Sequence, residues 1–155
     1  LVKLGLVPYG DIRPMDDECP TLTFNTIGRH QSRLVRTRVA SNLSPWLSQC
    51  EPGDIHTVAI SHGEGRFVCS PELQHELEVT GRIATQYVDE AGQPSMDWNV
   101  NPNGSVMAIE GITSPDGRVL GKMGHVERRG DGLYKNVPGD KFMPLFESGV
   151  KYFTD

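Results

Sequence analysis

The chain has 155 residues, with 15 Lys and Arg against 20 Asp and Glu, and its formal net charge is −5. This length is typical of one compact domain. The negative charge repels phosphate backbones and weighs against nucleic-acid binding. No stretch longer than twelve residues lacks a charged side chain, so none resembles a membrane-spanning helix, which needs about 20 mostly apolar residues. The composition therefore predicts a globular domain outside the membrane.

The chain has three cysteines, at positions 19, 50 and 69, and no two of them form a C-x-x-C pair. Neither a zinc knuckle nor a full disulfide framework is therefore expected. The N-terminus also lacks the basic and apolar segments of a secretory signal. We expect a cytoplasmic protein in a reducing compartment.

The first five residues, LVKLG, are typical of the last turn of a helix that ends at a C′ glycine, Gly5. Because no N-cap residue precedes this turn, we interpret the sequence as cut from a longer protein. The alternative is a short amphipathic turn at a natural terminus. Residues 7–20 are rich in Pro, Gly and acidic side chains, which predicts an ordered surface loop.

The middle of the chain predicts several strands and one helix. Residues 34–39 alternate, so that Arg36 and Arg38 lie on one face and Thr37 and Val39 on the other. We interpret the arginine-rich segment as a solvated strand face, with a phosphate or partner site as the alternative. Ser70-Pro71-Glu72 predicts a helix start, and that helix should end near Gly81. Further strands are expected at residues 21–25, 55–61, 66–69 and 83–88.

The C-terminal third predicts a β-hairpin and a helix. Two apolar runs, 107–113 and 118–123, flank the turn sequence Ser-Pro-Asp-Gly at 114–117. A final amphipathic helix is expected at 142–153, with Met143, Phe146, Val150 and Phe153 near helical spacing. Mixed strands with few helices indicate an α/β or α+β domain.

His125 and Glu127 follow the second strand of this hairpin and are separated by one residue. The two side chains can therefore reach a common point. An imidazole beside a carboxylate is the pair of base and orienting group used in nucleophilic catalysis. A surface histidine with an unrelated glutamate is the alternative interpretation of this spacing.

A second candidate region, Ser61-His62-Gly63-Glu64-Gly65, also follows a predicted strand. Its glycines allow the backbone to approach a ligand closely, and strand ends form ligand sites in α/β sheets. For His62 alone, a structural role in the turn is the alternative.

A nucleophile is harder to find. None of the three cysteines lies in a tight Gly-x-Cys-x-Gly elbow between a strand and a helix. The remaining histidines, His30, His56 and His75, have no partner at metal-ligand spacing. We therefore assign no metal ligand.

Three segments carry a specific family resemblance: VAISHGEGRF at 58–67, NPNGS at 101–105 and EGITSPDGRVLGKMGHVER at 110–128. Together they resemble phosphoribosylformylglycinamidine synthase of the large single-chain type. The similarity is to its C-terminal glutaminase domain, a class I glutamine amidotransferase, and it extends over essentially the whole chain.

The resemblance implies a fold and a set of roles. The fold would be part of a doubly wound, flavodoxin-like α/β sheet with an added β-hairpin, lacking its first strands and the nucleophile elbow, so that residues 1–155 are the C-terminal part of the domain. His125 would be the catalytic base and Glu127 its orienting group. The substrate glutamine would be held by Ser61, His62, Gly63 and Glu64, largely through backbone groups. Val126 departs from the wider superfamily, which commonly has Pro between the two catalytic residues.

The resemblance also implies partners and cofactors. ATP and Mg would act in the synthetase portion of the same parent chain, which uses the ammonia to amidate formylglycinamide ribonucleotide, and this part would need no cofactor. We expect no glutaminase activity from these 155 residues alone. We also expect an uncovered apolar face that promotes self-association.

Two alternatives belong to other functional classes. The first is a non-catalytic docking module that uses Arg29 to Arg38 and the loop 99–105. The second is a metal-dependent hydrolase that uses His62, Glu64, His125 and Glu127.

Overall fold

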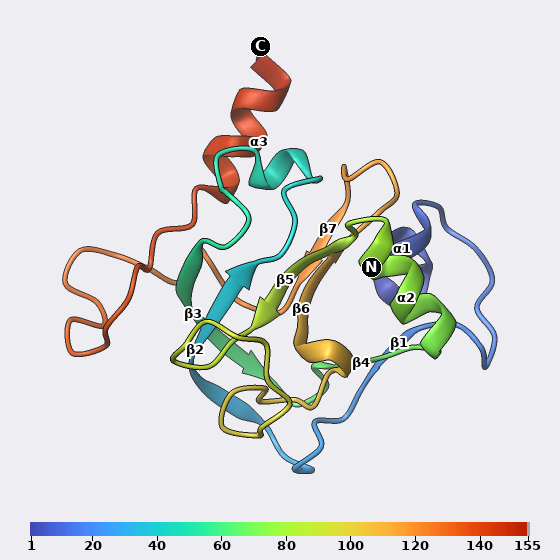
Figure 1. The fold of residues 1–155 in the computed structure, drawn as a ribbon, viewed down its shortest axis with the longest axis horizontal. Coiled ribbons are helices and arrows are strands. Elements are labelled where there is room, and N and C mark those ends of the chain that lie inside the picture. Colours follow the sequence, from blue (N-terminus) through green and yellow to red (C-terminus); the bar gives the residue numbers. More distant parts are fainter. Residues whose placement is uncertain (155) are drawn as a thin grey trace.

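Five strands form the main sheet of the protein, in the order β3-β2-β5-β6-β7, and β1 and β4 form a separate two-stranded ribbon (Figure 1). The structure is a computed structural model that describes residues 1–154. The elements in chain order are η1 (Val2–Leu4), α1 (Leu6–Tyr9), β1 (Thr21–Thr23), β2 (Gln31–Val39), η2 (Pro45–Leu47), β3 (Ile55–His62), β4 (Arg66–Val68), α2 (Pro71–Val79), β5 (Ile83–Tyr87), η3 (Val106–Ala108), β6 (Ile109–Thr113), β7 (Leu120–Lys122) and α3 (Leu145–Thr154).

The expected α/β fold with an added hairpin is confirmed, and the sheet is strongly curled (Figure 1). Its strand directions differ from those of a doubly wound sheet, because the paired strands of the described residues run antiparallel. Parallel neighbours need a crossover of a dozen or more residues, usually a helix. Only six residues, 114–119, separate β6 from β7, so these strands can pair only as a hairpin.

Two apolar clusters cover the two faces of the central strands. Ile83 and Ala84 are neighbours in β5, yet Ile83 packs in the cluster with α2 and the N-terminal segment, and Ala84 packs in the cluster with α3. Because neighbouring residues of a strand point to opposite faces, β5 is buried on both sides. All five residues of β5 and all five of β6 are buried. These two strands therefore form the rigid centre on which the loops of the site depend.

Local signals in the sequence placed most turns correctly. Gly5 ends η1 with φ 87°, a left-handed conformation that favours glycine. Ser70 caps α2 by accepting a hydrogen bond from the Leu73 N–H at 3.2 Å. In the hairpin, the Gly117 N–H donates to the Ser114 carbonyl at 2.9 Å. The short-range chemistry of caps and turns is thus sufficient to position these ends.

β2 carries three arginines, which were predicted to form a solvated face; all three are half-buried and bind the loop that follows β5. Arg33 donates to the Trp98 carbonyl, Arg36 to the Glu90 carbonyl and Arg38 to the Gly92 carbonyl, at 2.9, 2.9 and 3.4 Å. All three carbonyls belong to the loop that follows β5. Unpaired carbonyl groups of a loop need donors, and guanidinium groups supply them. These side chains hold the loop 89–98 against β2.

The apolar stripe predicted for the last helix lies at the surface of the described chain. Phe146, Val150 and Phe153 of α3 are 54%, 64% and 74% exposed. The helix packs instead through Gly149, where an added Cβ would lie 2.4 Å from the Trp46 ring. Because a glycine lets an aromatic ring approach the helix axis, α3 packs on Trp46 through Gly149, and Leu145 and Ser148 are its other buried residues.

The N-terminal segment packs beside the hairpin. A cavity of about 310 Å³, lined mainly by apolar side chains of η1, α1, β6 and β7, lies between them. β7 is the end strand of the sheet in the described residues. The self-association expected from such a surface stays a prediction. No helix within residues 1–154 has the length and apolar character needed to cross a membrane.

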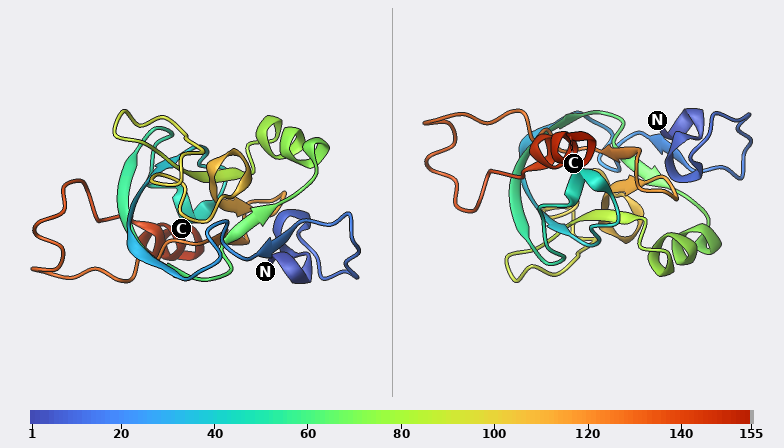
Figure 2. Two further views of the ribbon diagram at one scale, coloured as in Figure 1. Left: turned by 90° about the horizontal axis from the view of Figure 1, so that it is seen from below. Right: turned by 90° about the horizontal axis from the view of Figure 1, so that it is seen from above.

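Two loops project from the body in opposite directions, as both views of Figure 2 show. One is the N-terminal loop after α1, and the other is the segment between β7 and α3, which begins at the candidate site.

Candidate active site

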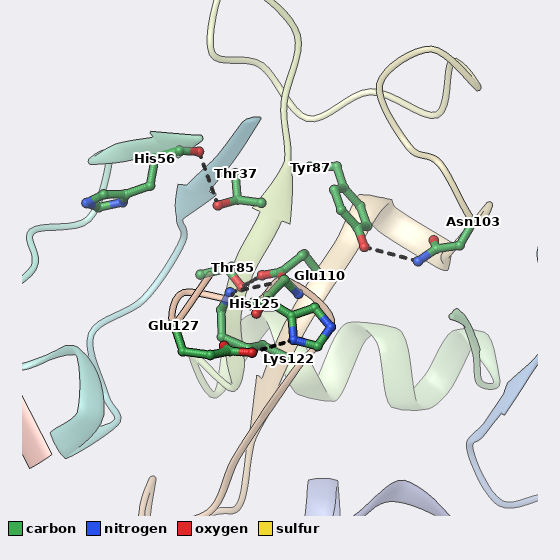
Figure 3. A network of polar contacts seen from close by, with 10 residues as sticks. Thr37, His56, Thr85, Tyr87, Asn103, Glu110, Lys122, His125 and Glu127 are labelled. Atoms are coloured by element: carbon green, nitrogen blue, oxygen red, sulfur yellow. Dashed lines mark hydrogen bonds and ion pairs between the residues drawn. The ribbon is translucent and has the colours of Figure 1, made fainter. Parts of the chain in front are cut away.

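His125 and Glu127 form a hydrogen-bonded pair three to five residues after the end of β7 (Figure 3). His125 Nδ1 lies 2.7 Å from Glu127 Oε1. The imidazole is one-third exposed and the carboxylate about half exposed, at 33% and 54%. The predicted contact between the two side chains is therefore present, and the pair remains accessible to a ligand.

The charge of Glu127 decides which nitrogen of the His125 ring carries the proton and which does not. Burial by itself would raise the pKa of the Glu127 carboxyl, but its own backbone N–H and the hydrogen bond from His125 hold that pKa below the usual value. An ionised carboxylate only accepts hydrogen bonds, so Nδ1 must carry the proton. In a neutral imidazole, Nε2 is then the unprotonated nitrogen that can act as a base.

The main chain of His125 is fixed to the C-terminal half of β3. The His125 N–H donates to the Ala59 carbonyl at 2.8 Å, in an isolated antiparallel bridge. Ala59 precedes Ser61 by two residues, so the His-Glu pair and the turn after β3 lie at the same end of that strand. The next residue, Val126, is 7% exposed and packs in the core. Its burial helps to fix the backbone between His125 and Glu127.

The turn after β3 is organised by a buried asparagine, Asn25. Its Nδ2 donates to the His62 carbonyl at 2.8 Å, and its Oδ1 accepts from the Gly65 N–H at 3.1 Å. The His62 ring lies 3.2 Å from the same Oδ1 and is only 9% exposed. A Cβ on Gly65 would lie 2.5 Å from that ring. The His62 side chain is therefore a structural part of the turn.

The other residues expected to hold glutamine differ in their surroundings. The Ser61 hydroxyl lies 3.1 Å from His30 Nε2, a partner that the sequence did not indicate. Gly63 is half-buried, and its carbonyl accepts from the Asn25 N–H at 2.9 Å. Glu64 is exposed. Binding of glutamine by these four residues stays a prediction.

The NPNGS loop, residues 101–105, is hydrogen-bonded to this turn. Asn101, Asn103 and Ser105 are buried, with 0 to 2% exposure. Ser105 Oγ lies 3.2 Å from the Gly65 carbonyl and accepts from the Phe67 N–H at 3.0 Å. These three side chains are therefore structural, and the docking alternative stays a prediction.

Neither Cys50, which is buried, nor Cys69, which is half-buried, is an activated nucleophile. Burial raises the pKa of Cys50 to about 11 and that of Cys69 also to about 11. A thiol needs a pKa near or below neutrality to supply a thiolate at physiological pH. Both are therefore structural side chains.

The metal-hydrolase alternative requires four side chains to converge. Within residues 1–154, no three His, Cys, Asp or Glu side chains are arranged to hold a metal ion. His62 is enclosed by Asn25 and Gly65, and His125 is paired with Glu127. This arrangement does not support a metal site.

The sequence analysis missed two charged residues beside the pair, Glu110 and Lys122. Glu110 lies in β6 and is fully buried, and Lys122 Nζ lies 3.1 Å from its Oε1. The signal available in the sequence was an isolated carboxylate inside an apolar strand, Ile109–Thr113. A buried carboxylate is costly unless it is paired, so such a residue predicts a partner.

Comparison with known proteins agrees with this geometry. Residues 1–153 match the model of the CobB/CobQ-like glutamine amidotransferase domain. The chain belongs to this family.

Individual relatives point to one branch of it. The chain is 42% identical over 114 residues to phosphoribosylformylglycinamidine synthase subunit PurQ of Thermomicrobium roseum, covering 74% of the chain and 46% of that relative. It is 37% identical over 120 residues to the subunit of the same name from a Synechococcus strain, covering 77% of the chain and 48% of the relative. The chain thus spans about half the length of these relatives.

A solved structure resembles the fold. The structure of PurLQS from Thermotoga maritima superposes with a TM-score of 0.63 at 25% identity, covering 86% of this chain and 53% of that one. The curled sheet is therefore part of a glutamine amidotransferase fold, as the resemblance of the sequence motifs implied.

Proposed function

We propose that this chain is the part of a glutaminase that carries the catalytic base and the glutamine-binding turn, and that the ammonia it releases serves the synthesis of formylglycinamidine ribonucleotide. The observation that carries the proposal is the His125–Glu127 pair at 2.7 Å, fixed beside the turn after β3. The PurQ relatives and the matching family model support the same activity.

The chemistry follows from the free Nε2 of His125. A thiol nucleophile loses its proton to this nitrogen and attacks the carboxamide carbon of glutamine. The same nitrogen then returns the proton to the departing ammonia, and a water molecule hydrolyses the thioester to glutamate. Glu127 holds the imidazole in the required tautomer and stabilises its charged form.

The nucleophile in this proposal lies outside the 155 residues. Cys50 and Cys69 have raised pKa values, and no thiol is hydrogen-bonded to His125 among the described residues. The resemblance supports a cysteine on a glycine-flanked elbow that precedes Leu1 in the parent protein.

The parent protein in this proposal is the large single-chain enzyme, with a cytoplasmic location. ATP and Mg²⁺ would act in its synthetase portion, and no described residue of this chain is assigned to them. An immunoblot of the natural protein tests the single-chain form. One large polypeptide is expected, whereas a small separate subunit would contradict it.

The activity is tested by comparing two nitrogen sources in the full-length gene product. We expect glutamine-dependent synthesis of formylglycinamidine ribonucleotide to be lost in His125→Ala, whereas synthesis from ammonium chloride continues. His75→Ala, which changes an exposed histidine of α2, serves as the matched control. Equal glutamine dependence in His125→Ala and in the unsubstituted protein would refute the proposal.

A further inference from the structure

A buried carboxylate, that of Glu110, contacts the residue that precedes the candidate base (Figure 3). The Glu110 side chain has no exposed surface, and that of Lys122 is 9% exposed. Glu110 Oε2 accepts from the Thr85 hydroxyl, and Oε1 accepts from the Gly124 N–H and from Lys122 Nζ. Three neighbouring strands, β5, β6 and β7, therefore meet at this carboxylate.

The carboxylate is ionised despite its burial. Burial raises the pKa of Glu110, but the Lys122 ammonium and the hydrogen bonds from Thr85 and Gly124 outweigh it and leave the pKa below the usual value. A buried ion pair is often no more stabilising than a well-packed apolar pair of similar size. Stability alone is thus a weak reason to place these charges here.

Both polar groups of the Gly124 backbone are held by this pair of side chains. The Gly124 N–H donates to Glu110, and the Gly124 carbonyl accepts from Lys122 Nζ at 3.2 Å. Only glycine permits this approach, since a Cβ at position 124 would lie 2.6 Å from Val58 Cγ2 and 2.8 Å from Glu110 Oε1.

Gly124 immediately precedes His125, whose own N–H is bound to Ala59. The backbone is therefore fixed on both sides of the peptide unit that carries the imidazole. The orientation of the ring depends on this backbone and on Glu127, so a shift at Gly124 would move Nε2.

We propose that Glu110 and Lys122 are positioning residues for His125: they fix the Gly124 peptide so that the free imidazole nitrogen faces the bound glutamine. This inference rests on the proposed glutaminase function. The proposal gives Glu110 and Lys122 a role in the turnover of glutamine, separate from any contribution to the stability of the fold.

Two double variants of the full-length gene product separate these roles. Both contain Lys122→Met, which avoids leaving an unpaired ammonium group in the core. One adds Glu110→Gln, whose amide oxygen can still accept from the Gly124 N–H and whose amide nitrogen can donate to Thr85. The other adds Glu110→Met, which is similar in length and accepts no such hydrogen bond. The variants therefore differ in the acceptor for Gly124 and in the partner for Thr85.

We expect kcat for glutamine hydrolysis to be about tenfold to a hundredfold lower in the Glu110→Met double variant than in the Glu110→Gln double variant. KM should differ by less than about threefold, because the turn after β3 is not altered. Thermal unfolding confirms that both variants fold. Equal kcat values in two folded variants would overturn the inference and leave the proposed function intact.

A second measurement covers the case in which the Glu110→Met double variant does not fold. Hydrogen exchange of the Gly124 amide in the unsubstituted protein should be slow compared with that of the exposed Gly132, because the Gly124 N–H is bound to a buried carboxylate. Equally rapid exchange at the two glycines would overturn the inference. Absence of glutamine hydrolysis in the unsubstituted protein would instead contradict the proposed function itself.

Discussion

The backbone N–H of His125 donates to the carbonyl of Ala59 at 2.8 Å, although the two residues are 66 positions apart. β3 and β7 lie at opposite ends of the sheet order, and the curl of the sheet brings the chain after β7 back to β3 (Figure 1). This bridge places the candidate base beside the turn that follows β3. The following predictions test the contacts that create the site.

Replacing Glu127 by Gln should reduce glutamine-dependent turnover of the full-length gene product by about tenfold to a thousandfold. The neutral amide no longer fixes the proton on Nδ1 or stabilises the charged imidazole. Glu127 is about half exposed, so the melting temperature should change little. Glu78→Gln, at an exposed position of α2, is the control. Full activity in Glu127→Gln would exclude an orienting role.

The 155-residue chain by itself should release no glutamate from glutamine. It contains the base and its orienting group, but burial raises the pKa of Cys50 and that of Cys69 to about 11. The assay compares the purified chain with its His125→Ala variant. Turnover that disappears in the variant would mean that Cys19, Cys50 or Cys69 is the nucleophile.

Asn25→Ala should lower the free energy of unfolding by about 2–4 kcal/mol, since it leaves several buried or partly buried groups without a partner. Those groups are the carbonyls of Arg29 and His62, the Gly65 N–H and the His62 ring. Urea unfolding measures the change, with the exposed Asn99→Ala as the reference. If both substitutions cost the same, the turn does not depend on Asn25.

The stability of the protein should decrease as the pH falls below about 6.5, the usual pKa of histidine. Burial lowers the pKa of His62 in the folded protein, so the unfolded chain takes up a proton at a pH where the folded chain does not. Protonation therefore favours unfolding until the pH passes the folded-state value. His56 has a pKa lowered in the same direction, also by burial.

Urea unfolding between pH 7.5 and pH 5.5 measures this slope. We expect a shallower slope in His62→Asn and no change in His75→Asn, because His75 is exposed. An unchanged slope in His62→Asn would mean that the His62 ring titrates alike in the folded and unfolded states.

Gly149→Ala should destabilise the protein by about 1–3 kcal/mol, because the new methyl group would lie 2.4 Å from the Trp46 ring. Helix propensity alone predicts the opposite, a gain of roughly 0.5–1 kcal/mol. Lys151→Ala, at an exposed position of the same helix, is the control. Stabilisation by Gly149→Ala would show that α3 does not pack on Trp46.

The sequence by itself determined the local elements of this protein. The Ser70 cap, the turn at 114–117 and the alternation along β2 depend on neighbouring residues only, and each was predicted within a few positions. The spacing of His125 and Glu127 showed that the two side chains could reach a common point, and the family resemblance, not the spacing alone, favoured their pairing, which the structure contains. The motifs further indicated the amidotransferase family.

The tertiary structure decided which surfaces those elements bury and which distant groups meet. The arginines of β2 bind a loop because unpaired carbonyls from far along the chain lie over them. The stripe of α3 faces outward because Gly149, and not Phe146 or Val150, fits against Trp46. The contacts of Glu110 with Thr85, Lys122 and Gly124 depend on the pairing of β6 with both β5 and β7, which brings groups from three strands to one carboxylate.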